Sequence, residues 1–145
     1  MKDLGSLNIY SMFKKYYICQ FQKKLNLSLH PSDGLGYDAV WKKLEQQKLT
    51  IPKALFEYYA LTGDHWLNIT HNQLLTIEEL EWVDDKLVFM QENQGIACWG
   101  IIKADASKPN PFVWQGVNGQ WDREEYRLSK FLIRMWQWTI AEEPE

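Results

Sequence analysis

Residues 86–102 read KLVFMQENQGIACWGII, and this stretch decides the fold that the sequence predicts. Residues 86–92 and Ala97–Ile102 are rich in apolar, β-branched and aromatic side chains, as strands are. Residues 93–95, Asn-Gln-Gly, separate them with residue types that favour a turn. The stretch therefore predicts a β-hairpin, and the segments on either side of it decide how large the sheet becomes.

The sequence on the C-terminal side extends the sheet and then changes to a helix. Pro111 precedes residues 112–114, which read as a further strand, and a proline at its start favours a sheet edge. Asn118-Gly119 is a strong signal for a second hairpin. A helical stripe of apolar side chains follows within residues 128–138. Its members are Leu128, Phe131, Leu132, Met135 and Trp136.

The sequence on the N-terminal side becomes helical. Residues 76–79, Thr-Ile-Glu-Glu, form a capping box, which predicts a short helix that ends near Trp82. Residues 67–70 are short and β-prone. Pro52 marks the start of a longer helix, because proline is preorganised for the first helical position. We expect Gly63 to end that helix in the left-handed conformation.

The first fifty residues predict two more helices. Ser6 and Asp38 are their candidate N-caps. Residues 16–21 also suit a strand, so the second half of the first helix has two interpretations. Helices, then a run of antiparallel strands, then a helix together predict an α+β fold. We expect one domain over residues 1–145, with a single antiparallel or mixed sheet, N-terminal helices and one closing C-terminal helix.

Composition fits such a domain and excludes several classes of protein. The 145 residues are 46% hydrophobic and 24% charged, which is typical of globular chains and excludes disorder throughout. No apolar run approaches the roughly 18 residues of a membrane span, and the first residues lack the apolar stretch of a signal peptide. We therefore expect a cytoplasmic protein without a membrane partner. Cys98 lies in an apolar stretch, and we expect it to be a small buried hydrophobe.

Motifs for catalysis and metal binding are weak. The three histidines, His30, His65 and His71, match neither the HExxH pattern nor a zinc-finger spacing. A metal site with His65 and His71, or a pair of Cys98 with a histidine, is an alternative without a supporting cluster. Lysine pairs near the N-terminus could contact nucleic acid, but arginine, the usual reader of bases, is absent before residue 123. We expect no enzyme, no catalytic residues, no metal, no cofactor and no nucleic-acid partner.

The charge is unevenly distributed along the chain. Residues 1–54 have a net charge of +5 and residues 55–145 a net charge of −8. Acidic surfaces attract basic proteins, and exposed tryptophan beside carboxylates is typical of binding hot spots. We expect Trp82 and Trp114 to be partly exposed. The candidate partner-binding surface comprises Glu78, Glu79, Glu81, Trp82, Asp84, Asp85 and Glu92, with a second acidic cluster at Asp122, Glu124 and Glu125. The alternative is a solvated face with no role beyond solubility.

Four segments, taken in order, resemble the SUKH superfamily. The first runs through Leu44-Glu45, Ile51-Pro52, the aromatic residues 55–59 and Thr62-Gly63. The second is residues 89–99, FMQENQGIACW, which are similar to the family's hairpin. The third is residues 110–113, similar to an Asp-Pro-x-Val strand entry, and the fourth is the closing helix at 128–138. The resemblance covers residues 38–140. Ile51 and Asn110 depart from the usual leucine and aspartate, and residues 1–37 have no counterpart and are expected to form a helical N-terminal extension.

The resemblance implies helices around a single sheet and no catalytic residues. Many bacterial members are immunity proteins that bind and neutralise toxins, often nucleases, and a fungal relative regulates cell-wall synthesis. We therefore expect a non-enzymatic immunity protein, a monomer or weak dimer, that binds a basic toxin domain. A regulatory scaffold that binds a non-toxin cellular protein is the alternative.

Overall fold

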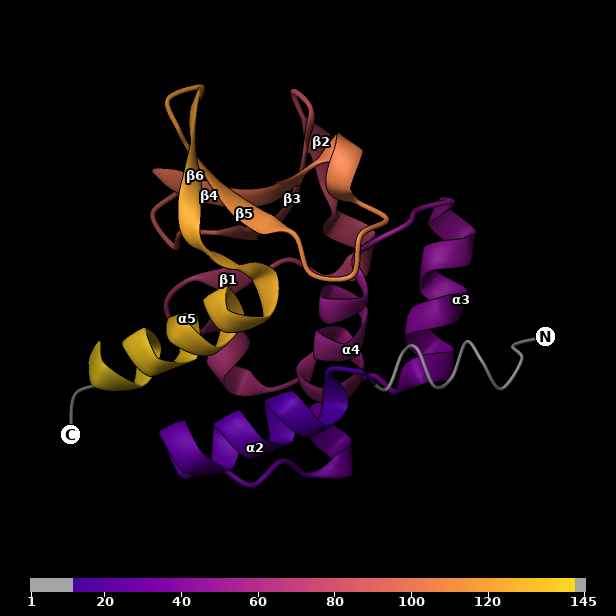
Figure 1. Ribbon diagram of the computed structural model, residues 1–145, viewed down its shortest axis with the longest axis vertical. Helices are drawn as coiled ribbons and strands as arrows, with labels where there is room; N and C mark the ends of the chain where they lie inside the picture. The colour runs from indigo at the N-terminus through magenta and orange to yellow at the C-terminus, as the bar shows by residue number, and fades with distance from the viewer. Residues whose placement is uncertain (1–11, 143–145) are drawn as a thin grey trace.

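The computed structural model describes residues 12–142, which have the predicted α+β fold (Figure 1). Its helices are α2 (Lys14–Leu25), α3 (Tyr37–Gln47), α4 (Lys53–Thr62) and α5 (Leu128–Glu142). Its strands are β1 (Gln73–Leu74), β2 (Glu81–Val83), β3 (Lys86–Gln91), β4 (Ala97–Ile102), β5 (Phe112–Val117) and β6 (Gln120–Arg127). The 3₁₀ helices are η1 (Pro31–Asp33), η2 (Trp66–Ile69), η3 (Ile77–Glu79) and η4 (Lys103–Asp105). No helix within residues 12–142 is long and apolar enough to cross a membrane.

The strands form one antiparallel sheet in the order β1-β3-β4-β5-β6, and β2 pairs with the half of β3 that β1 leaves free. The predicted hairpin of β3 and β4 is confirmed, with Lys86 opposite Ile102. The second hairpin is confirmed too. Asn118 and Gly119 both have positive φ, 51° and 78°, which the tight turn between β5 and β6 requires. β5 lies between β4 and β6, so the prediction of an edge strand is wrong. Pro111 precedes the first paired residue and therefore removes no ladder hydrogen bond.

In Figure 1 the sheet lies at one end of the molecule and α2 at the other, with α4 and α5 between them. Side chains on one face of the sheet pack into the core against the helices. Leu87, Phe89, Ile101 and Val113 are at most 1% exposed. The predicted closing helix α5 covers this face, and its ring of Phe131 contacts the ring of Phe89. Burial of this apolar stripe is the main stabilising term of the fold.

Helix α2 belongs to the domain core. Tyr17 and Phe21 have no exposed surface, and the Tyr17 hydroxyl donates to the carbonyl of Ala54 at 2.7 Å. The Phe21 ring stacks on the Trp136 ring of α5 at 4.5 Å between centroids. The helical interpretation of residues 16–21 is therefore right, and the strand is excluded. The predicted cap Ser6 lies outside the described residues.

Gly63 is the C-cap of α4, as predicted, but it is not left-handed, and the predicted N-cap Asp38 of α3 is wrong. Gly63 has φ −56° and ψ −26°, which is right-handed. A Cβ atom there would lie 2.6 Å from the carbonyl oxygen of Tyr59, so the position needs glycine for close packing and not for a positive φ. Asp38 lies inside the first turn of α3, and the N-cap is Gly36, whose φ is 83°. The glycine reaches a backbone conformation that aspartate rarely adopts.

Two short segments also differ from their prediction. Residues 67–70, predicted as β-prone, belong mostly to η2, where the side chain of Asn68 is buried and accepts a hydrogen bond from Tyr58. The capping box at Thr76 is confirmed, but η3 ends at Glu79 instead of near Trp82. Residues 81–83 instead form β2, which pairs with β3. Pairing with a distant strand overrides the local helical signal here.

Candidate protein-binding surface

The acidic stretch predicted as a binding surface lies on η3, β2 and the β2–β3 turn. Residues 81–85 are all exposed. Trp82 keeps 43% of its surface exposed and Val83 keeps 39%, so an apolar pair lies among carboxylates at the edge of the sheet. The prediction that Trp82 and Trp114 are partly exposed is confirmed, since Trp114 is half-buried.

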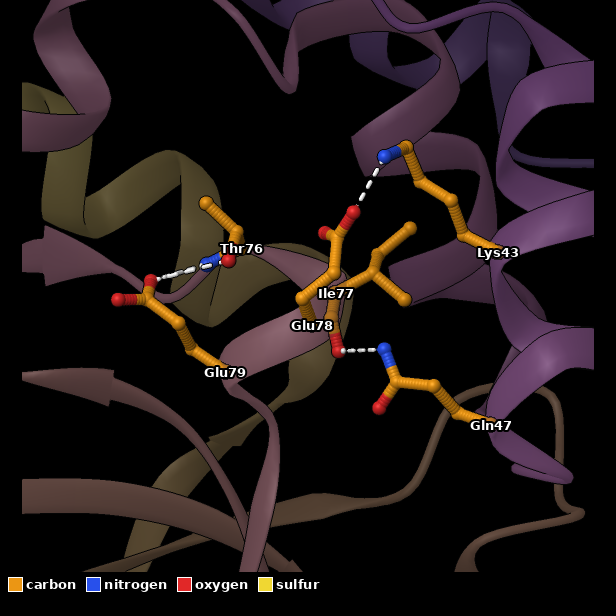
Figure 2. A network of polar contacts seen from close by, with 6 residues as sticks. All are labelled: Lys43, Gln47, Thr76, Ile77, Glu78 and Glu79. Carbon is orange, nitrogen blue, oxygen red and sulfur yellow. Dashed lines mark hydrogen bonds and ion pairs between the residues drawn. The ribbon is translucent and has the colours of Figure 1, made fainter.

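Glu78 and Glu79, two of the predicted binding residues, take part in the contacts that hold η3 in place. Figure 2 shows Lys43 and Gln47 reaching from α3 to η3. Lys43 forms an ion pair with Glu78, and this hydrogen bond lowers the pKa of the Glu78 carboxyl. Gln47 donates to the carbonyl of Ile77 at 2.8 Å. Glu79 accepts from the backbone N–H of Thr76 at 2.9 Å and completes the capping box. Both carboxylates are therefore occupied by structural contacts.

Two more carboxylates are fixed at the start of β3. Asp84 accepts a hydrogen bond from the indole N–H of Trp121 on β6 at 3.0 Å. Asp85 accepts from the ammonium of Lys86 at 2.5 Å, and this contact lowers the pKa of Asp85. Lys86 itself is only 7% exposed. Its ammonium lies 5.3 Å from the ring centre of Trp114 and 5.0 Å from that of Trp121, in cation–π range.

The remaining acidic residues do not join this edge as one surface. Glu124 is half-buried in a cleft with Phe131 and Arg134 of α5, and burial raises the pKa of its carboxyl. Glu92 follows β3 and is half-buried, while Asp122 and Glu125 on β6 are exposed. Of the ten predicted residues, the structure groups Glu81, Trp82, Asp84 and Asp85 most closely, since they are nearly consecutive.

The sheet face away from the core carries residues that the sequence analysis missed. Along β5, Phe112 and Trp114 are half-buried, whereas Val113 between them has no exposed surface. The guanidinium groups of Arg123 and Arg127 lie 4.3 and 4.4 Å from the ring centre of Phe112. Residues 112–114 are apolar without alternation, so no signal for a two-sided strand was present in the sequence.

A hollow of about 310 Å³ opens on this face, between β2 and the β5–β6 turn. Its lining includes Glu81, Asp84, Val88, Ile96, Cys98 and Trp121. Gly116 also lines it and leaves room for the indole opposite, because a Cβ atom at Gly116 would lie 2.8 Å from the ring of Trp121. A strand glycine covered by a cross-strand aromatic side chain is a known way to stabilise a sheet. No lysine or arginine is among the residues that line the hollow.

Cys98 and the histidines show no activated arrangement. Cys98, expected to be a small buried hydrophobe, is half-buried and packs against the core. Burial raises the pKa of its thiol, which favours the unreactive protonated form. His65 Nδ1 accepts from the backbone N–H of Leu67 at 3.1 Å, and burial lowers its pKa. Within the described residues no group of three or more histidine, cysteine or acidic side chains could hold a metal ion.

A second exposed apolar pair lies on η2 and was not predicted. Trp66 is 58% exposed and Ile69 is 65% exposed. A 3₁₀ helix repeats every three residues, so the two side chains lie on the same side. Leu67 and Asn68 between them are buried, so the residue types alone gave no signal for the exposed pair.

Comparison of the chain with protein-family models, with curated proteins and with solved structures finds no match. The resemblance to the SUKH superfamily therefore stays a prediction.

Proposed function

We propose that this chain is a non-enzymatic protein-binding domain, and that it acts as an immunity protein that neutralises a basic toxin domain by direct binding. The observation that carries the proposal is the exposed edge at residues 81–85, where Trp82 and Val83 lie between carboxylates. Tryptophan is enriched in binding hot spots, and exposed carboxylates steer a basic partner toward the surface.

Preorganisation supports the proposal. Asp84 is held by Trp121, and the neighbouring Asp85 is held by Lys86, so the turn loses little conformational freedom on binding. The charge of Asp85 is largely offset by Lys86, which leaves Glu81 and Asp84 as the carboxylates that act at long range. That the partner is a toxin is inferred from the SUKH resemblance, because the known bacterial members of that superfamily often bind nucleases. A nuclease presents a basic cleft to phosphate, and an acidic edge with an aromatic anchor complements such a cleft.

The test begins with affinity capture from the native host and identification of the retained protein. The captured protein is then purified, and its dissociation constant is measured for the wild-type chain, for Trp82→Ala and for Trp138→Ala. Trp138 is a matched control, because it is 48% exposed but lies on α5. We expect Trp82→Ala to weaken binding about 30-fold or more, which is the roughly 2 kcal/mol of a hot spot. Trp138→Ala should change it less than about threefold.

The activity of the captured partner distinguishes an immunity protein from a regulatory scaffold, the two functions that the sequence left open. Inhibition of a toxin's activity at stoichiometric concentration would support the immunity protein. Retention of a non-toxin cellular protein, with the same effect of Trp82→Ala, would support the regulatory scaffold instead. Equal effects of the two tryptophan substitutions would show that residues 81–85 are not the binding edge.

A further inference from the structure

The hollow beside residues 81–85 combines a negative charge with an apolar lining. Glu81 and Asp84 supply carboxylates, and Ile96 and Trp121 supply apolar and aromatic surface. Its volume of about 310 Å³ lies at the low end of the range of roughly 300–1,000 Å³ for ligand sites, which suits one large side chain. No described residue that lines it carries a positive charge.

Positive charge close to the hollow is already compensated. Lys86 contacts the ring of Trp121, but its side chain is 8% exposed and its ammonium is bound to Asp85. Glu81 has no such partner among the ion pairs and hydrogen bonds of the described residues. The hollow therefore has a net negative charge that a bound cation would balance.

We propose that the hollow receives an arginine side chain of the partner protein, with its guanidinium group bound by Glu81 and Asp84. This inference rests on the proposed function, since it names the partner group recognised at the same edge. A guanidinium group offers five N–H donors in a planar fork, so it can donate to two carboxylates at once. Its aliphatic stem packs on the exposed side chain of Ile96 and on Trp121.

Asp84 is suited to this role by its fixed position. One of its oxygens, Oδ2, accepts from the indole of Trp121, which orients the carboxylate and leaves Oδ1 for a ligand. Glu81 lies on β2 opposite Val88, so its backbone is fixed by the pairing with β3. Arginine is favoured over lysine because it is more weakly hydrated and loses less when it enters a partly apolar hollow.

The test uses a small probe and does not require the partner. Isotope-labelled protein is titrated with N-acetyl-arginine amide and, as the neutral isostere, with N-acetyl-citrulline amide. We expect the arginine probe to shift the amide signals of Cys98 and Gly116 and the indole N–H signal of Trp121, with saturation in the millimolar range. The citrulline probe should leave these signals in place. Shifts spread over all acidic segments, or equal shifts with citrulline, would overturn the proposal.

Two variants localise the effect. Glu81→Gln should weaken binding of the arginine probe about fivefold, the size expected for one exposed ion pair. Asp64→Asn is the matched control, since Asp64 is exposed just after α4 and does not line the hollow, and it should leave the affinity unchanged. The spectra of both variants report whether they fold. An unchanged affinity in Glu81→Gln, or equally tight binding of N-acetyl-lysine amide, would contradict the assignment.

Failure of the proposed arginine site can be distinguished from failure of the proposed function. A partner whose binding depends on Trp82 but not on Glu81 would leave the function standing and overturn the arginine site. Saturable arginine binding that depends on Glu81, in a chain that captures no protein, would support the site and contradict the function.

Discussion

Glu57 is a carboxylic acid in the interior of α4 with no exposed surface. It accepts hydrogen bonds from the backbone N–H of Phe13 at 2.8 Å and from the hydroxyl of Tyr37 at 3.3 Å. Burial outweighs these contacts and the charge of Lys14, and it raises the pKa of Glu57 from 4.5 to about 7. The folded state therefore binds a proton more tightly than the unfolded state does.

We expect the free energy of unfolding to fall as pH rises from about 5 to 8, because Glu57 must then ionise in the interior. The contribution of this residue is fully present below pH 4.5 and is lost as pH passes through 7. A shift of this size corresponds to about 3 kcal/mol. Urea denaturation across this pH range measures the slope. Glu57→Gln should remove most of it, while Asp122→Asn, an exposed control, should keep it; a slope that survives in Glu57→Gln would assign the effect to other groups.

At the scale of single elements, the β5–β6 hairpin contains two glycines that are required for different physical reasons. Gly116 has an ordinary backbone conformation, but a Cβ atom there would lie 2.8 Å from the ring of Trp121. Gly119 faces open space, but its φ is +78°. We expect Gly116→Ala to cost about 1–3 kcal/mol through displacement of the indole and to change the tryptophan fluorescence. Gly119→Ala should cost about 1 kcal/mol through the backbone alone, with unchanged fluorescence.

The 3₁₀ helix η2 depends on one buried amide. Asn68 accepts from the hydroxyl of Tyr58 at 2.6 Å and from the indole N–H of Trp136 at 3.2 Å, and its amide donates to Thr62. Asn68→Ala would leave two buried donors without this acceptor, and we expect it to cost about 2–4 kcal/mol in thermal denaturation. Thr70→Ala removes a more exposed bond and should cost less than about 1 kcal/mol. Equal losses of stability in Asn68→Ala and Thr70→Ala would show that the Asn68 amide does not connect η2 to the core.

The elements that local sequence determines were predictable, and those that depend on distant pairing were not. β3 and β4 follow from their apolar residues and the turn between them, and the second hairpin follows from Asn118-Gly119. β2 consists of exposed residues without alternation and exists because it pairs with β3. The acidic side chains of the candidate site were visible in the sequence. The hollow was not, since the contact between Asp84 and Trp121 joins opposite ends of the sheet.

At the scale of the whole molecule, α2 and α5 stabilise one another. Phe21 has no exposed surface and stacks on Trp136, which is 2% exposed. We expect Phe21→Ala to lower the free energy of unfolding by about 3–5 kcal/mol in a single cooperative transition. Ile18→Ala, on the same helix but 41% exposed, should cost less than about 1 kcal/mol. A small effect of Phe21→Ala would mean that α2 is an appendage and not part of the core.

The stacking of Phe21 on Trp136 also orders events during protein synthesis. A ribosome delivers α2 early and α5 late, so Tyr17 and Phe21 emerge long before the ring that covers Phe21. The hairpins β3–β4 and β5–β6 involve neighbours in sequence and can assemble in the meantime. Until α5 is released, the nascent chain presents aromatic surface that chaperones bind. A chain that ends before residue 128 therefore lacks the ring that covers Phe21.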